Sequence, residues 1–260
     1  MPAVVLLHGC GQTPAEFADA TRFVDAADRS GFVLVLPHQE GRHHPQRCWR
    51  WYEVAHQHRG AGEPAVLAGM IGQVVAEQSR WRVDPRRVYA AGLSAGGAMA
   101  LTLAAVYPDL VAAVGVHSAP AYRSATRPAL AFAAMGARTA VPAPETGVPM
   151  APVIVVQGTA DGVVQARNGN RIAGQWLDFR SAATGADPGR SRTTSGRSAD
   201  GRAWTAARWY GARGRKVLEL WRIEGLGHAW SGGRPGGSFS DPAGPRAATL
   251  MWQFFRLHRL

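Results

Sequence analysis

Short runs of β-branched and aliphatic residues alternate along the chain with longer helical patterns, and this alternation limits the fold more than any other feature. Several of the runs are apolar on both faces, as strands buried within a parallel sheet are. Strands that alternate with helices build an α/β structure, so the sequence predicts a doubly wound, mostly parallel sheet with helices on both faces. The expected strands are Ala3 to Leu7, Phe32 to Leu36, Arg87 to Ala91, Val111 to His117, Pro152 to Gln157 and Val217 to Ile223.

Helical spacing of apolar residues fills the gaps between some of these strands. The apolar residues from Val66 to Val75 recur at this spacing, and the stretch from Ala95 to Tyr107 reads as a helix stopped by Pro108. Beyond Arg246, the apolar pattern fits a closing amphipathic helix.

Three segments do not follow this pattern. Pro37 to Pro64 and Ser118 to Pro152 are rich in Pro, Gly, Ala and Arg or carry clustered aromatic residues, so we expect loops or lid-like insertions. Arg180 to Arg202 almost lacks large apolar residues, and we expect a mobile surface excursion there.

Length and composition predict a single domain over residues 1–260, because 260 residues with 46% hydrophobic content can bury one large core. The net charge of +11 comes from arginines scattered through the chain, which favours a solvated basic surface over a nucleic-acid partner. No run reaches the roughly 20 apolar residues of a membrane span, and no signal peptide is present. If the chain is complete, these features predict a cytoplasmic protein.

The strongest local signal is Gly92-Leu93-Ser94-Ala95-Gly96, which follows an expected strand and precedes an expected helix. In a nucleophile elbow a serine occupies such a strand-to-helix turn, and the flanking glycines avoid collisions with neighbouring backbone. If the five-residue motif is taken without its surroundings, the alternative is a serine that only caps the helix. The position between strand and helix favours Ser94 as a nucleophile.

A serine nucleophile needs a histidine to take its proton and a carboxylate to hold that histidine, and in this fold both lie downstream in the order Ser, acid, His. Asp161 lies in the turn after the expected strand that ends at Gln157, and His228 lies directly after the strand that ends at Ile223. The alternatives are a turn-forming aspartate and an ordinary loop histidine. The order of the three residues favours Asp161 as the acid and His228 as the general base.

An oxyanion hole needs two backbone N–H groups, one from the residue after the nucleophile and one from a loop after an early strand. Ala95 and Cys10 are the candidates, and we expect His8 to shape the loop that carries Cys10. The histidines of the polar loop are expected to be solvated, and nothing pairs them with carboxylates at metal-ligand spacing, so no metal is assigned. These loop histidines are His43, His44, His56 and His58.

With these residues identified, the sequence resembles the extracellular polyhydroxybutyrate depolymerases and the related feruloyl and acetylxylan esterases of the α/β-hydrolase superfamily. The resemblance runs through nearly the whole chain. Its motifs are His8-Gly9-Cys10, Gln12-Thr13-Pro14, Arg47-Cys48-Trp49, Arg59-Gly60, Gly62-Glu63-Pro64, Gly92 to Met99, Gly115-Val116-His117-Ser118 and Gly227 to Gly233.

The resemblance implies hydrolysis of short-chain 3-hydroxyalkanoate esters through an acyl-enzyme on Ser94, with no cofactor and with Asp161 as the acid. It also implies a secreted protein. Four aromatic residues resemble the walls of a substrate groove, with core residues that fix the loops as the alternative: Trp49, Trp51, Tyr52 and Trp230. The position of Trp230 next to His228 favours the groove for that residue. Family members usually have a signal peptide and one or two further strands before the oxyanion loop, so we expect either a trimmed start or an abbreviated edge of the sheet here. No separate substrate-binding domain follows the catalytic motifs, which favours oligomers or small esters over crystalline polymer.

Two other functions remain open. A feruloyl or acetylxylan esterase would use the same triad, and a non-catalytic polymer-binding protein could keep the hydrolase fold. The pairing of the two cysteines is also open, because Cys10 and Cys48 could be buried thiols or one bridge. Both lie in motifs of the resemblance, and a bridge would tie the aromatic loop to the oxyanion loop.

Overall fold

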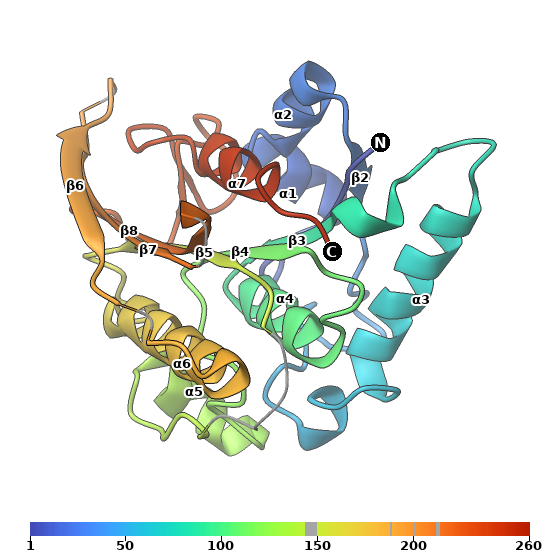
Figure 1. Cartoon of the computed structure of the whole chain (residues 1–260), viewed down its shortest axis with the longest axis horizontal. Helices are drawn as coiled ribbons and strands as arrows, with labels where there is room; N and C mark the ends of the chain where they lie inside the picture. The colour runs from blue at the N-terminus through green and yellow to red at the C-terminus, as the bar shows by residue number, and fades with distance from the viewer. Residues whose placement is uncertain (144–149, 188, 200, 212–213) are drawn as a thin grey trace.

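A computed structural model describes residues 1–143, 150–187, 189–199, 201–211 and 214–260. Eight strands form one sheet in the order β2-β1-β3-β4-β5-β8-β7-β6 (Figure 1). The neighbouring pairs from β2 through β5 to β8 are parallel. At the other edge β7 pairs antiparallel with both β8 and β6. The strands are β1 (Ala3–Leu7), β2 (Val33–Val35), β3 (Val88–Leu93), β4 (Ala113–His117), β5 (Val153–Gly158), β6 (Arg192–Arg197), β7 (Ala203–Tyr210) and β8 (Lys216–Ile223).

Helices cover both faces of this sheet, so the predicted doubly wound, mostly parallel fold is confirmed (Figure 1). One apolar cluster lies between the sheet and α3, α4, α5 and α6, and a second lies between the sheet and α1, α2 and α7. The helices are α1 (Pro14–Ala20), α2 (Phe23–Ser30), α3 (Gly62–Ala76), α4 (Ala95–Val106), α5 (Pro128–Met135), α6 (Arg167–Thr184) and α7 (Ala247–Phe255), with short 3-10 turns η1 (Val54–His56) and η2 (Pro85–Arg87).

The central strands are buried along their whole length, which explains why they could be recognised in the sequence. Every residue of β1, β3, β4 and β5 is buried. Strands covered on both faces are apolar throughout, and each of the six expected strands matches an observed one within two residues at either end. The helices expected near residues 66–75, 95–107 and beyond 246 correspond to α3, α4 and α7.

The structure corrects the expectation for the segment from Arg180 to Arg202. It holds the end of α6 and the edge strand β6, where a mobile excursion was expected; residues 188 and 200 lie outside the described residues. All six residues of β6 are exposed, so neither face needs apolar side chains and the strand has no hydrophobic pattern. Its neighbour β7 and most of α6 were also not predicted.

The two segments expected to be loops or lid-like insertions contain short helices. Pro37 to Pro64 includes η1 and the start of α3, and Ser118 to Pro152 includes α5, with residues 144–149 outside the described part of the chain. A two-stranded sheet of β9 (Trp230–Ser231) and β10 (Ser240–Asp241) lies after β8. In the described residues, no helix combines the length and the hydropathy that a bilayer crossing requires.

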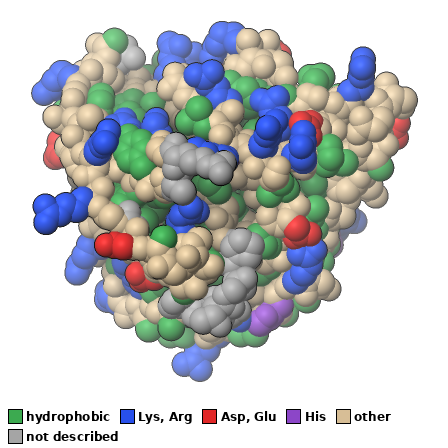
Figure 2. All heavy atoms as spheres, viewed as in Figure 1, with side chains coloured by type: hydrophobic (Ala, Val, Ile, Leu, Met, Phe, Trp, Pro, Cys, Tyr) green, Lys and Arg blue, Asp and Glu red, His purple; other side chains and the backbone are tan. Residues whose placement is uncertain are grey.

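Lysine and arginine side chains are spread over the face of the molecule shown in Figure 2 and do not gather in one patch there. Several arginines are paired with carboxylates: Arg59 with Asp109, and Arg202 with Asp241. The basic side chains on this face are therefore dispersed, and some arginines of the chain are neutralised by neighbouring carboxylates.

Candidate active site

Ser94 lies in a strained turn between β3 and α4. Its backbone has φ 55° and ψ −120°, which a residue with a side chain rarely adopts. Its N–H donates to the carbonyl oxygen of His117 at 3.0 Å, so the neighbouring strand β4 holds the turn in place. Backbone strain of this kind persists only where the surroundings enforce it, and it concentrates at functional sites.

Two glycines allow this turn to form. A Cβ atom at Gly92 would lie 2.4 Å from the carbonyl carbon of Gly96, and one at Gly96 would lie 2.1 Å from the carbonyl oxygen of Leu7. These neighbours are backbone atoms that cannot move aside. The glycine spacing of the motif is therefore a steric requirement of the observed turn.

Asp161 and His228 form a hydrogen-bonded pair at the same edge of the sheet. His228 Nδ1 lies 2.9 Å from Asp161 Oδ2 and 3.1 Å from Oδ1. Asp161 follows β5 and His228 follows β8, so the carboxyl ends of parallel strands bring them together although they are 67 residues apart in sequence. The structure thus joins two residues that the sequence analysis paired.

The Asp161 carboxylate is buried and held by several donors. Its Oδ1 accepts from the N–H groups of Val163 at 3.0 Å and Val164 at 2.8 Å, and its Oδ2 accepts from Gln157 Nε2 at 3.2 Å. Burial alone opposes ionisation, but the hydrogen bonds and the charge of His228 outweigh it and lower the pKa of Asp161. The acid is therefore held as a carboxylate facing the imidazole.

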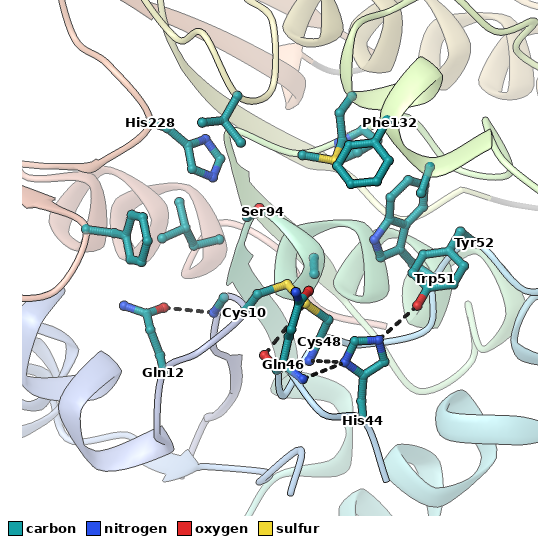
Figure 3. A pocket seen from close by; sticks show the side chains of 18 of the residues that line it. Cys10, Gln12, His44, Gln46, Cys48, Trp51, Tyr52, Ser94, Phe132 and His228 are labelled. Carbon is teal, nitrogen blue, oxygen red and sulfur yellow. Dashed lines mark hydrogen bonds between the residues drawn. A yellow bond between two sulfur atoms is a disulfide. The ribbon is translucent and has the colours of Figure 1, made fainter. Parts of the chain in front are cut away.

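Ser94 and His228 both line one cavity of about 470 Å³ at this edge of the sheet. Figure 3 shows His228 on one side of Ser94, the disulfide below it, and three aromatic residues across the cavity. Apolar side chains dominate the lining. It consists of Gly9, Cys10, Gln12, His44, Gln46, Cys48, Trp51, Tyr52, Leu93, Ser94, Ala95, Pro120, Pro128, Ala131, Phe132, Met135, Val163, His228 and Phe239.

In the described part of the chain, the loop after β1 contains one backbone donor without an acceptor, at a residue that lines this cavity. The N–H of Gly9 donates to Gln12 Oε1 at 2.9 Å, and the N–H of Gly11 donates to the carbonyl oxygen of Gln46 at 2.8 Å. Between them, the N–H of Cys10 has no acceptor within the described residues, and neither has that of Ala95 at the first turn of α4. These are the two groups that the sequence analysis selected for an oxyanion hole.

A second set of contacts fixes this loop from behind. His8 is buried; its Nδ1 lies 2.8 Å from the carbonyl oxygen of Gly9, and its Nε2 accepts from the N–H of Gln39 at 3.1 Å. Trp49 Nε1 donates to the carbonyl oxygen of His8 at 3.0 Å. His8 therefore shapes the loop, in agreement with its expected position.

Cys10 and Cys48 are joined by a disulfide, which is one of the two possibilities that the sequence left open. The bond ties the loop after β1 to the aromatic loop that carries Trp51 and Tyr52, and all four residues line the cavity. The bridge thus links the candidate oxyanion donor to the opposite wall of the site.

The three tryptophans expected to line the substrate groove have different positions. Trp51 lines the cavity, whereas Trp49 and Trp230 are buried behind it and lie outside its lining. Trp230 packs against the rings of Phe17 and His117, with ring centroids at 5.7 Å and 5.1 Å. Its burial supports a structural role rather than the groove wall that its position beside the base suggested.

Other residues of the cavity were not selected from the sequence. Phe132, Val163 and Phe239 line its mouth and are 77%, 49% and 50% exposed. They lie on α5 and on surface loops, where single apolar residues carry no periodic signal. Only the unusual exposure of large apolar side chains around one opening marks them.

Two of the loop histidines are not simply solvated, which corrects the expectation. His44 Nδ1 accepts from the N–H groups of Gln46 and Cys48, both at 3.2 Å, and so braces the aromatic loop. The side chain of His56 is 14% exposed, and its Nδ1 accepts from the N–H of Glu63 at 3.1 Å. The described parts of the chain contain no cluster of three or more His, Cys, Asp or Glu residues able to hold a metal ion.

The sequence pattern of the "Esterase PHB depolymerase" family matches residues 1–197, which include Ser94 and Asp161. The chain belongs to the PHB depolymerase esterase family. Poly(3-hydroxyalkanoate) depolymerase C of Paucimonas lemoignei is 29% identical over 87% of this chain and 54% of its own length. Feruloyl esterase B of Neurospora crassa is 34% identical over 46% of this chain and 40% of its own length.

Among solved structures, the acetyl xylan esterase of Aspergillus awamori superposes on this PHB depolymerase family member with a TM-score of 0.73. The superposition covers 98% of this chain and 89% of the other, at 18% sequence identity. That similarity establishes the α/β-hydrolase fold. The chain spans about half the length of the curated relatives that it matches.

Proposed function

We propose that this protein is a serine carboxylic-ester hydrolase that acts through an acyl-enzyme on Ser94. The observation that carries the proposal is the Asp161–His228 pair beside a strained serine in one apolar cavity. In this arrangement Ser94 is the nucleophile, His228 the general base and Asp161 the acid that orients the histidine.

Acylation begins when the Ser94 hydroxyl attacks the ester carbonyl carbon and His228 Nε2 takes its proton. Asp161 accepts a hydrogen bond from Nδ1–H of His228, which leaves Nε2 of His228 as the basic nitrogen. The same carboxylate stabilises the imidazolium that forms. The tetrahedral intermediate then expels the alcohol, which receives the proton from His228. The acyl group stays on Ser94 Oγ.

The negative oxygen of each tetrahedral intermediate requires donors that are already oriented. Cys10 and Ala95 line the cavity, and their N–H groups have no acceptor in the described chain, so they can serve as this pair. In deacylation His228 removes a proton from water, the resulting hydroxide attacks the acyl carbonyl, and the serine is regenerated. No cofactor enters this scheme.

For the substrate we propose a short-chain 3-hydroxyalkanoate ester or oligomer. The mainly apolar lining suits an aliphatic acyl chain, and the relative from Paucimonas lemoignei is named as a poly(3-hydroxyalkanoate) depolymerase. The apolar residues around the mouth would extend contacts to the next unit of an oligomer.

A feruloyl esterase with the same triad is the second candidate. Trp51, Tyr52 and Phe132 form an aromatic side of the cavity that could stack on a ferulate ring, and a relative bears that name. Both candidates share the mechanism and differ only in which acyl group the cavity accepts.

A substrate panel tests the proposal. Wild-type protein and Ser94→Ala are compared on p-nitrophenyl butyrate, 3-hydroxybutyrate oligomers and methyl ferulate, and labelling by a fluorophosphonate is located by mass spectrometry. We expect oligomer cleavage, label on Ser94, and a loss of kcat of about 10⁴-fold in the variant. Cleavage of ferulate alone would replace the substrate, and absence of both turnover and label would indicate a binding protein on a hydrolase fold.

A further inference from the structure

His117 is a fully buried histidine at the end of β4 that takes no part in the proposed reaction. Its Nε2 lies 3.0 Å from the backbone nitrogen of Ser231, three residues beyond His228. Its Nδ1 lies 3.1 Å from Ser118 Oγ. The imidazole therefore connects the chain after the candidate base to the first residue after β4.

The partners of the ring determine which nitrogen carries the proton. A backbone N–H can only donate, so Nε2 of His117 must be the acceptor for Ser231. A neutral imidazole then has its hydrogen on Nδ1 and donates it to Ser118 Oγ. Burial, and next the charge of His228, lower the pKa of His117 to about 3, which keeps the ring neutral near pH 7.

Ser118, like Ser94, has a positive φ and a backbone N–H bonded to a carbonyl oxygen of the neighbouring strand. It is fully buried, has φ 50°, and donates its N–H to the carbonyl oxygen of Val156 on β5 at 3.0 Å. Because its hydroxyl oxygen accepts from His117, its own hydrogen is available to the Asp161 carboxylate. After burial and His228, Ser118 is among the smaller influences on the pKa of Asp161, which places its hydroxyl near that carboxylate. A non-glycine residue with positive φ in a buried position is a costly arrangement that points to a function.

We infer that His117 and Ser118 are positioning residues for the Asp161–His228 pair. Ser118 donates to the acid, while His117 orients that hydroxyl and anchors Ser231 behind the base. This inference rests on the proposed function, because it assigns the two residues a role in that triad. Neither residue lines the cavity, so neither contacts the substrate.

We call the connection from His117 through Ser118 to Asp161 the relay, and it has a defined electrostatic effect. A donor from Ser118 shares the negative charge of Asp161 and reduces its pull on the proton of the imidazolium. Removal of that donor concentrates the charge toward His228 and increases the affinity of the base for its proton. It also lets the carboxylate rotate away from Nδ1, which slows the chemical step.

The test compares Ser118→Ala and His117→Phe with wild type on p-nitrophenyl butyrate from pH 5 to 9. We expect kcat to fall about tenfold in each variant, much less than the roughly 10⁴-fold expected for loss of the acid, with KM unchanged. The acid limb of the kcat/KM profile should move to higher pH by about 0.5 unit in Ser118→Ala. The combined loss in the double variant should be smaller than the product of the two single losses, because both changes break the connection from His117 through Ser118 to Asp161.

His258→Phe is the matched control. His258 is also buried, but it packs on Phe254 of α7. Its carbonyl oxygen accepts from Tyr89 near the start of β3, at the opposite end of the strands from His117. This variant should leave the profile in place. His117→Asn supplies a rescue, because its amide N–H can replace the Nδ1 donor to Ser118; we expect its acid limb to stay near that of wild type.

The pH titration of His228 by NMR of ¹⁵N-labelled imidazoles separates this inference from the proposed function. An upward shift in Ser118→Ala supports the relay even if no ester in the panel is cleaved. An unmoved titration and an unmoved acid limb, with only a lower Tm, would overturn it while leaving the triad intact. Failure of the proposed function would appear instead in wild type, as absence of turnover and of serine labelling.

Discussion

The N–H of Ser94 donates to the carbonyl oxygen of His117 at 3.0 Å, at the carboxyl ends of two neighbouring strands. Leu93 and His117 are partners in the β3–β4 register, so this bond continues the ladder one residue beyond β3. The sheet thereby holds the turn at φ 55°, and His117 holds Ser94 through its backbone while its side chain contacts Ser118 and Ser231. The geometry of the candidate triad thus depends on the packing of β3 against β4.

Gly96→Ala should disrupt this turn. The added Cβ would lie 2.1 Å from the carbonyl oxygen of Leu7 and 2.5 Å from that of His8, so the start of α4 and the end of β1 would have to separate. We expect a loss of about 3 kcal/mol of unfolding free energy and of ester hydrolysis, measured by urea denaturation and p-nitrophenyl butyrate assay. Gly72→Ala on α3, where a Cβ meets open space, should be neutral or slightly stabilising.

Asp161→Asn should retain the fold and lose most activity. The amide can donate to His228 Nδ1, which favours the tautomer with its hydrogen on Nε2 and removes the base. We expect kcat to fall about 10⁴-fold with little change in KM. Asp178→Asn, on the exposed side of α6, should leave kcat unchanged. Equal losses in both variants would contradict the role of Asp161.

Loss of the Cys10–Cys48 disulfide should reduce both stability and turnover. The bridge closes a separation of 38 residues, and its removal in Cys48→Ala should cost about 3 kcal/mol. Because Cys10 supplies a candidate oxyanion donor, kcat should fall as well. Thermal unfolding and steady-state kinetics, each with and without dithiothreitol, check this: the reductant should affect wild type and leave Cys48→Ala unchanged.

Phe132→Ala should weaken substrate binding without slowing the chemistry. The ring lines the cavity mouth and is 77% exposed, so it contributes little to the folded core but can contact a bound ester. We expect KM for 3-hydroxybutyrate oligomers to rise about threefold to tenfold, with kcat and Tm near those of wild type. Val66→Ala, which is 60% exposed and outside this cavity, is the control.

His258 should make the protein sensitive to acid. Burial, followed by the charges of Arg215, Arg180 and Lys216, lowers its pKa from 6.5 to about 4, and neither ring nitrogen has a partner in the described chain. Between these pH values the unfolded chain binds more protons, so stability is greatest above pH 6.5 and falls as pH decreases toward 4. In His258→Phe the decrease of Tm between pH 7 and pH 4.5 should be smaller; an equal decrease would assign the acid sensitivity to other groups.

The sequence alone determined the central sheet and the identity of the candidate triad. Buried parallel strands are apolar on both faces, which made β1, β3, β4 and β5 recognisable. The strand-to-helix position of Ser94 and the order of Asp161 and His228 followed from local steric rules and from the connectivity of the fold. These signals lie within short stretches of the sequence, so they can be read without the tertiary structure.

Only the tertiary structure decided which distant residues surround that triad. The exposed strand β6 has no apolar face and so no pattern, and the cavity mouth combines Phe132, Val163 and Phe239 from separate segments. Trp49 and Trp230, which belong to motifs of the resemblance, pack behind the cavity because a side chain's direction depends on the elements around it. The relay through His117 and Ser118 likewise exists only because β4, β5 and the chain after β8 meet at one edge of the sheet.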